Sequence, residues 1–66
     1  MENLKSWPHL AFIDAGTVAS IIKAENPDFQ PVVVLAGSPV TKDLQSGRVR
    51  LFVNVQNLVI EVPREG

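Results

Sequence analysis

The chain has 66 residues, no cysteine and a formal net charge of −1. A chain this short forms one domain, residues 1–66, and buries only about 60% of the surface that it exposes when unfolded. Because six basic residues stand against seven acidic ones and His9 is the only imidazole, we expect no nucleic-acid partner, no membrane partner, no metal and no cofactor.

The N-terminal half predicts one helix. We expect residues 1–6 to be poorly ordered and the helix to cover about residues 14–25. Asp14 is a good N-cap, and Ile13 before it can pack on Val18. Asn26-Pro27 ends the helix. The helical spacing predicts a single apolar stripe, which consists of Ala15, Val18, Ile21 and Ile22.

The C-terminal half predicts three strands. Residues 32–36 form a β-branched run consistent with a strand buried on both faces, and residues 48–55 alternate as a half-buried strand does. Residues 58–63 predict a third strand, joined to the second by a hairpin turn at Gln56-Asn57. We therefore predict an α+β fold in which a single helix packs on a small mixed β-sheet.

A long connection, residues 37–47, separates the first two predicted strands. Connections in small domains usually have about four to six residues, so this one is either functional or a sign of wrongly assigned elements. Pro39, Val40 and Thr41 favour an extended backbone. An exposed, extended loop that carries Lys42 suits a trypsin-like protease, whose deep pocket accepts a long basic side chain. A lysine in a surface loop is, however, most often only solvated.

Arg48 and Arg50 lie on one face of their strand, because side chains repeat every two residues. Both can reach back under the loop to Thr41 and Asp43, where charge-assisted hydrogen bonds would replace the disulfide that the chain lacks. The alternative is two arginines that simply face solvent on an edge strand.

The segments "SWPHL", "VVVLAGSPVTKD", "GRVRLFVN" and "VPREG" together resemble the potato inhibitor I family of serine protease inhibitors, from Trp7 to Gly66. The resemblance implies an exposed reactive-site loop whose reactive bond is Lys42-Asp43, and it implies that Trp7 anchors the core. The implied protease-binding residues are Pro39, Val40, Thr41, Lys42, Asp43 and Leu44. The implied loop supports are Thr41, Asp43, Arg48, Arg50 and Gly66.

The sequence departs from the family pattern at four positions. Gly47 stands where Asp or Asn is common, and we expect it to loosen the distal end of the loop. Gln45 stands where Arg is common, so one further support or enzyme contact is missing. Ser46 stands where disulfide-bearing members have Cys, and Phe12 replaces a residue that is often Gly.

These features predict a serine protease inhibitor that binds like a substrate, with trypsin-like enzymes as its targets. Two alternatives stay open, an inhibitor aimed mainly at subtilisin-type or chymotrypsin-type enzymes and a non-inhibitory module whose mobile loop is a substrate. We do not expect an enzyme, because His9 is the only base available to the serines. We expect a soluble monomer without a signal peptide, and the compartment stays open.

Overall fold

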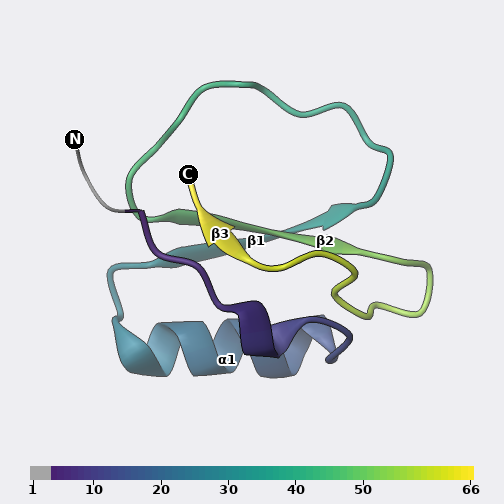
Figure 1. Ribbon diagram of the computed structural model, residues 1–66, viewed down its shortest axis with the longest axis horizontal. Helices are drawn as coiled ribbons and strands as arrows, with labels where there is room; N and C mark the ends of the chain where they lie inside the picture. The colour runs from purple at the N-terminus through teal and green to yellow at the C-terminus, as the bar shows by residue number, and fades with distance from the viewer. Residues whose placement is uncertain (1–3) are drawn as a thin grey trace.

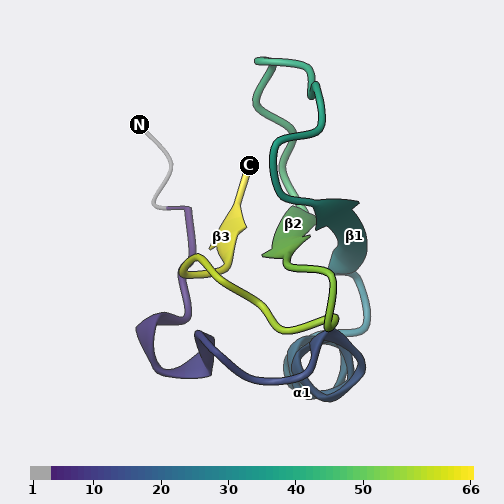
Figure 2. The ribbon, with the colours of Figure 1, turned by 90° about the vertical axis from the view of Figure 1, so that its right-hand side faces the viewer.

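The computed structural model describes residues 4–66 and contains one α-helix and a three-stranded sheet. A short 3₁₀ helix, Pro8–Leu10, precedes α1 (Ala15–Glu25), which is followed by β1 (Gln30–Leu35), β2 (Arg48–Val53) and β3 (Arg64–Glu65). The strand order is β1-β2-β3, with β1 and β2 parallel and β2 and β3 antiparallel. The helix covers one side of the sheet, and the long β1–β2 loop arches from the opposite side (Figures 1 and 2). The predicted α+β fold is confirmed.

The helix α1 begins and ends close to the predicted bounds. The Asp14 carboxylate accepts a hydrogen bond from the Thr17 N–H at 3.2 Å, which satisfies one of the free donors of the first turn. The Asn26 N–H donates to the Ile22 carbonyl at 3.1 Å, where the helix ends. Ala15, Val18 and Ile22 are buried, whereas Ile21 is 40% exposed, so the predicted stripe is one residue too wide.

The core lies between α1 and the helix-facing side of β2. Val49, Leu51 and Val53 are buried and alternate with partly exposed residues, as predicted for a half-buried strand. Trp7 is 2% exposed and packs edge-on against Phe29, with ring centroids 5.4 Å apart. Its indole N–H donates to a Glu25 oxygen at 2.8 Å. The expected role of Trp7 as a core anchor is confirmed.

The prediction of a strand buried on both faces at residues 32–36 is wrong. In β1, Val32, Val33 and Leu35 are 42%, 52% and 51% exposed. The reason is that β1 is the edge strand of a small sheet and pairs only with β2. A β-branched run in so thin a fold therefore marks a strand without telling how deeply it is buried.

The predicted strand at residues 58–63 is also wrong, although the chain does turn back at Gln56-Asn57 as predicted: Val59 forms an antiparallel bridge with Val53, and the Ile60 N–H donates to the Phe52 carbonyl at 2.8 Å. Only Leu58 and Val59 form isolated bridges, and the third strand lies further on, at Arg64–Glu65. The Asn54 side chain accepts hydrogen bonds from the N–H groups of Gln56 and Leu58, at 2.9 and 3.0 Å. This turn ends β2 early and leaves Val55 91% exposed, although the alternation had placed it in the core.

The expected poor order of residues 1–6 stays a prediction. Residues 1–3 lie outside the described residues. Ser6 forms an antiparallel bridge with Arg64, and the Lys5 carbonyl accepts a hydrogen bond from the Glu65 N–H at 2.8 Å. The segment from Lys5 onward is therefore paired with β3. Within residues 4–66, no helix is long and apolar enough to cross a membrane.

The backbone at Phe12 explains why glycine suits this position, and nothing in the structure explains the phenylalanine. Its φ angle is +64°, in the left-handed region that a bulky side chain rarely adopts, and its ring is 74% exposed. The N–H of Phe12 is committed to the Val59 carbonyl, which fixes the backbone in this conformation. Glycine adopts this conformation without the steric cost.

Replacing Phe12 with glycine should therefore stabilise the fold. We expect the free energy of unfolding in urea to rise by about 1 kcal/mol, the cost of left-handed backbone for an L-residue less the entropy that glycine loses. Phe12→Ala is the matched control, because it removes the exposed ring and keeps the strained φ angle. A glycine variant less stable than the alanine variant would show that the backbone conformation carries no strain, because only the entropy cost of glycine would then remain.

Candidate functional site

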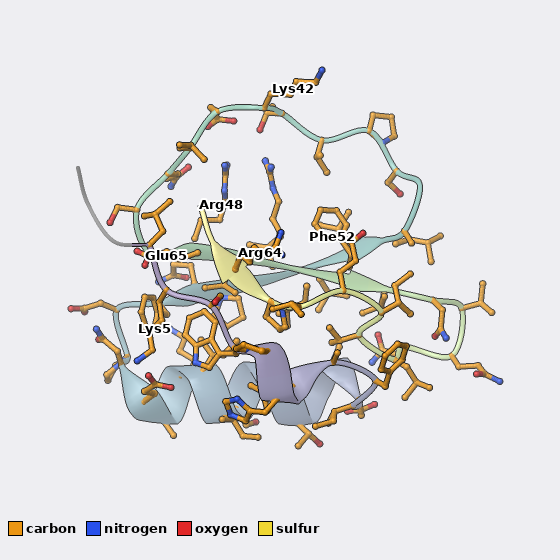
Figure 3. The ribbon with its side chains drawn as sticks, viewed as in Figure 1. Lys5, Lys42, Arg48, Phe52, Arg64 and Glu65 are labelled. Atoms are coloured by element: carbon orange, nitrogen blue, oxygen red, sulfur yellow. The ribbon has the colours of Figure 1, made fainter. Side chains whose placement is uncertain are left out.

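The candidate site is the loop between β1 and β2. Residues 37–46 are all exposed and contain no helix or strand. Figure 1 shows this segment as a wide arch on the side of the sheet away from α1. Lys42 lies at the top of the arch, and its side chain points away from the rest of the molecule (Figure 3). A side chain in this position can enter a pocket of another protein without any rearrangement of the sheet.

Arg50 holds the loop on the N-terminal side of Lys42. Its guanidinium donates to the Thr41 carbonyl at 2.7 Å and to the Thr41 hydroxyl oxygen at 2.5 Å. Two nitrogen atoms of the same guanidinium group therefore bind the backbone and the side chain of Thr41. Such paired, charge-assisted bonds fix orientation as well as distance.

Arg48 holds the loop on the C-terminal side of Lys42. It donates to the Asp43 carbonyl at 2.8 Å and to the Gly66 carbonyl at 2.8 Å, with longer contacts to the Asp43 carboxylate (3.5 Å) and the Gln45 side-chain oxygen (3.3 Å). Only 13% of its side chain is exposed, so it has little freedom to leave these partners. Figure 3 shows the extended Arg48 side chain rising from the sheet toward the arch.

The C-terminal residue joins the same network. The Gly66 N–H donates to the Arg48 carbonyl at 2.7 Å, and the Gly66 carbonyl accepts a hydrogen bond from the Arg48 Nε–H. The structure thus brings together Thr41, Asp43, Arg48, Arg50 and Gly66. Pro39, Val40 and Leu44 lie on the exposed arch, and no side-chain hydrogen bond joins Lys42 to the described residues.

A hollow of about 300 Å³ lies beneath the top of the arch. The loop contributes Thr41 to Leu44 to its lining, and the sheet contributes Phe52 and Arg64 among others. Because the loop does not rest directly on packed side chains here, the arginine hydrogen bonds are its main support from below.

The electrostatics of the network favour an ionised Asp43. A hydrogen bond from the Thr41 hydroxyl is the main cause that lowers the pKa of Asp43 below 3.8, and Arg48 adds a smaller contribution in the same direction. A carboxyl group whose pKa is lower in the folded protein stabilises the fold above its unfolded pKa. That contribution is lost as the pH falls through the folded pKa.

We therefore expect the Asp43 carboxyl carbon to titrate in NMR spectra with a midpoint below 3.8. In Thr41→Val, which keeps the shape and removes the hydroxyl donor, the midpoint should move up toward the ordinary aspartate value. An Asp43 midpoint unaffected by the loss of the hydroxyl would contradict this account.

Gly47, which we expected to loosen the distal end of the loop, makes hydrogen bonds through both its N–H and its carbonyl. Its φ angle is +87°, which explains why glycine is suited to this position. Its N–H donates to a Glu65 oxygen at 2.7 Å, and its carbonyl accepts from the Gln30 N–H at 2.7 Å. Gln45 likewise takes part in the network, since its carbonyl accepts the Arg48 N–H at 3.2 Å.

The sequence did not point to Glu65, which contacts Ser46 and Gly47. The residue belongs to β3, which we had predicted several residues earlier in the chain. The register of β3, which pairs Glu65 with Val49, places the carboxylate beside the distal end of the loop. A carboxylate next to the chain end was the only sequence signal.

Comparisons with known proteins identify the family of this chain. The family model of the potato inhibitor I family matches residues 1–66. An inhibitor of trypsin and Hageman factor from Cucurbita maxima is 43% identical over 61 residues, which cover 92% of this chain and 90% of the relative. A wound-induced proteinase inhibitor from Solanum peruvianum is 46% identical over 59 residues, covering 88% of this chain and 53% of the relative.

Solved structures show the same fold. The crystal structure of a bitter gourd trypsin inhibitor superposes with a TM-score of 0.90 at 34% identity, covering 97% of this chain and 96% of that one. The solution structure of Cucurbita maxima trypsin inhibitor V gives a TM-score of 0.72 at 42% identity, covering 94% and 91%. The chain therefore belongs to the potato inhibitor I family, a family of serine protease inhibitors and not of enzymes.

Proposed function

We propose that the chain inhibits trypsin-like serine proteases by offering Lys42-Asp43 as a bond that is bound tightly and cleaved very slowly. One observation carries the proposal. Arg50 and Arg48 bind the carbonyl groups of Thr41 and Asp43, one on each side of Lys42, while the lysine side chain points outward. The arginines thus fix the backbone around the Lys42-Asp43 bond, while the Lys42 side chain stays free to enter the pocket of a protease.

Binding follows from this preorganisation. A loop that is already extended loses little conformational entropy when it docks, so more of the contact energy remains as affinity. Lys42 would enter the acidic specificity pocket of a trypsin-like enzyme. Interfaces of about 1,600 Å² in total suffice, because protease–inhibitor complexes of this size are among the tightest known.

Slow net cleavage follows from the same supports. Attack by the enzyme's serine on the Lys42 carbonyl carbon forms an acyl-enzyme, breaks the bond to the Asp43 nitrogen and passes the serine proton to the new amine. Arg48 still holds the Asp43 carbonyl, so the amine stays beside the acyl group. Its high effective concentration favours re-formation of the peptide bond over attack by water.

The relatives support this choice of target. The Cucurbita maxima protein and both solved structures are described as trypsin inhibitors. A basic residue at the top of the arch suits the same enzyme class. Subtilisin-type and chymotrypsin-type enzymes are the alternative targets, and the test therefore compares inhibition of all three enzyme classes.

The test measures inhibition constants against trypsin, chymotrypsin and subtilisin side by side, with the chain recovered afterwards for mass spectrometry. We expect the tightest inhibition with trypsin and a largely intact chain. Fragments ending at Lys42, together with restored trypsin activity, would show a substrate and overturn the proposal. Tighter binding to chymotrypsin or subtilisin would overturn the assignment of the target.

A further inference from the structure

The Glu65 carboxylate lies where three segments of the chain meet. Its Oε2 accepts hydrogen bonds from the Gly47 N–H at 2.7 Å and from the Ser46 hydroxyl at 3.3 Å. Its Oε1 accepts from the Lys5 N–H at 3.2 Å. Oε2 therefore binds the distal end of the loop, and Oε1 binds the N-terminal segment.

The surrounding backbone fixes this position. The Glu65 N–H donates to the Lys5 carbonyl at 2.8 Å, and Ser6 forms a bridge with Arg64, so the N-terminal segment runs along β3. On its other side β3 pairs with β2, close to the point where the loop enters that strand. Figure 3 shows Glu65 beside the descending end of the arch and above Lys5.

We propose that Glu65 is a positioning residue for inhibition, which ties the distal end of the loop to the N-terminal segment without a covalent bond. The inference rests on the proposed function. Arg48 and Arg50 act on the middle of the arch, whereas Glu65 acts where the arch returns to the sheet. Because the Gly47 carbonyl is already bound by Gln30, Glu65 supplies the tie on the amide side of the same residue.

A carboxylate fits this position better than other side chains do. Both of its oxygens accept hydrogen bonds, and its negative charge strengthens each of them. A glutamine of the same length has only one acceptor oxygen, so it can serve either the loop or the N-terminal segment. Consistently, the Gly47 N–H is the main cause that lowers the pKa of Glu65, followed by the Lys5 N–H.

The first experiment uses the free protein and follows amide hydrogen exchange by NMR. In Glu65→Ala we expect the Gly47 amide to exchange at least about tenfold faster, and in Glu65→Gln we expect an intermediate rate. The Val18 amide in α1 should keep its rate in both variants. Glu61→Gln is the matched control, because Glu61 lies on the same C-terminal segment and makes no side-chain hydrogen bond within residues 4–66. An unchanged Gly47 rate in both Glu65 variants would overturn the tie.

The second experiment measures the rate at which trypsin cleaves Lys42-Asp43, by quantifying the two fragments over time. We expect the rate to rise from the native chain to Glu65→Gln and again to Glu65→Ala. A residue that only fills space would give the glutamine variant the native rate. Unfolding in urea checks that each variant is folded, and the glutamine variant carries the test if the alanine variant is not.

The two proposals fail in different ways. If trypsin rapidly cuts the native chain, the proposed function fails, and hydrogen exchange at Gly47 alone decides whether the Glu65 tie exists. If the native chain inhibits trypsin and all Glu65 variants are cleaved at the same rate as the native chain, the proposed role of Glu65 in inhibition is refuted while the proposed function stands.

Discussion

Replacing Lys42 with alanine should weaken trypsin inhibition by about a thousandfold, equivalent to about 4 kcal/mol. The lysine side chain reaches outward from the top of the arch, so it would be the anchor in the enzyme's specificity pocket. Without the lysine, the acidic residue at the bottom of that pocket has no partner. The supports below the loop are untouched, so the free energy of unfolding should stay within about 0.5 kcal/mol of the native value. Inhibition constants and urea unfolding check the two statements.

Two further variants serve as controls for Lys42. Lys42→Arg keeps a long basic side chain and should retain inhibition within about tenfold. Lys23→Ala removes a lysine from α1, on the side of the sheet away from the loop, and should leave inhibition unchanged. Unaltered trypsin inhibition by the Lys42→Ala protein would refute the assignment of Lys42.

Local patterns were enough to predict α1 and β2. The N-cap Asp14 and the Asn26-Pro27 sequence define the helix ends through contacts within a few residues. The alternation of Val49, Leu51 and Val53 reports a strand with one buried face. Both signals act at short range, and so the sequence displays them directly.

A local β-branched run also marked β1 without telling how exposed it is, whereas β3 depends on long-range pairing that no local pattern shows. β3 consists of Arg64–Glu65, a pair without strand propensity that pairs because the chain end lies between β2 and the N-terminal segment. The apolar residues 58–60 predicted a strand more strongly, but the turn around Asn54 gives them only isolated bridges. Tertiary context therefore overrode propensity in this part of the chain.

In the candidate site, too, the residues that follow a local pattern could be predicted, and those that depend on long-range pairing could not. The period of a strand predicts that Arg48 and Arg50 share a face, and a guanidinium that lies beside a loop is expected to bind its oxygen atoms. Glu65 depends on the register of β3, and Gly47 depends on a positive φ angle and on two partners from distant segments. Geometry of this kind becomes visible only once the strands are placed.

Replacing Arg50 with alanine should change the fate of the reactive bond more than the stability of the fold. The variant loses both hydrogen bonds to Thr41, the residue directly before Lys42, at a point where a hollow lies beneath the arch. We expect trypsin to cleave Lys42-Asp43 at least about tenfold faster, because the acyl group and the new amine can drift apart before they rejoin. The free energy of unfolding should fall by only about 1 kcal/mol, since the lost bonds lie outside the core.

Arg64→Ala is the matched control for Arg50→Ala, because Arg64 is the cross-strand partner of Arg50 and lines the same hollow without a hydrogen bond to the loop among the described residues. It should be cleaved at the native rate. Arg50→Lys keeps the charge and loses the planar fork, so its cleavage rate should lie between the native and alanine values. If mass spectrometry finds Arg50→Ala hydrolysed as slowly as the native chain, the loop does not depend on this support, and its resistance to cleavage must come from other contacts, such as those of Arg48 and Glu65.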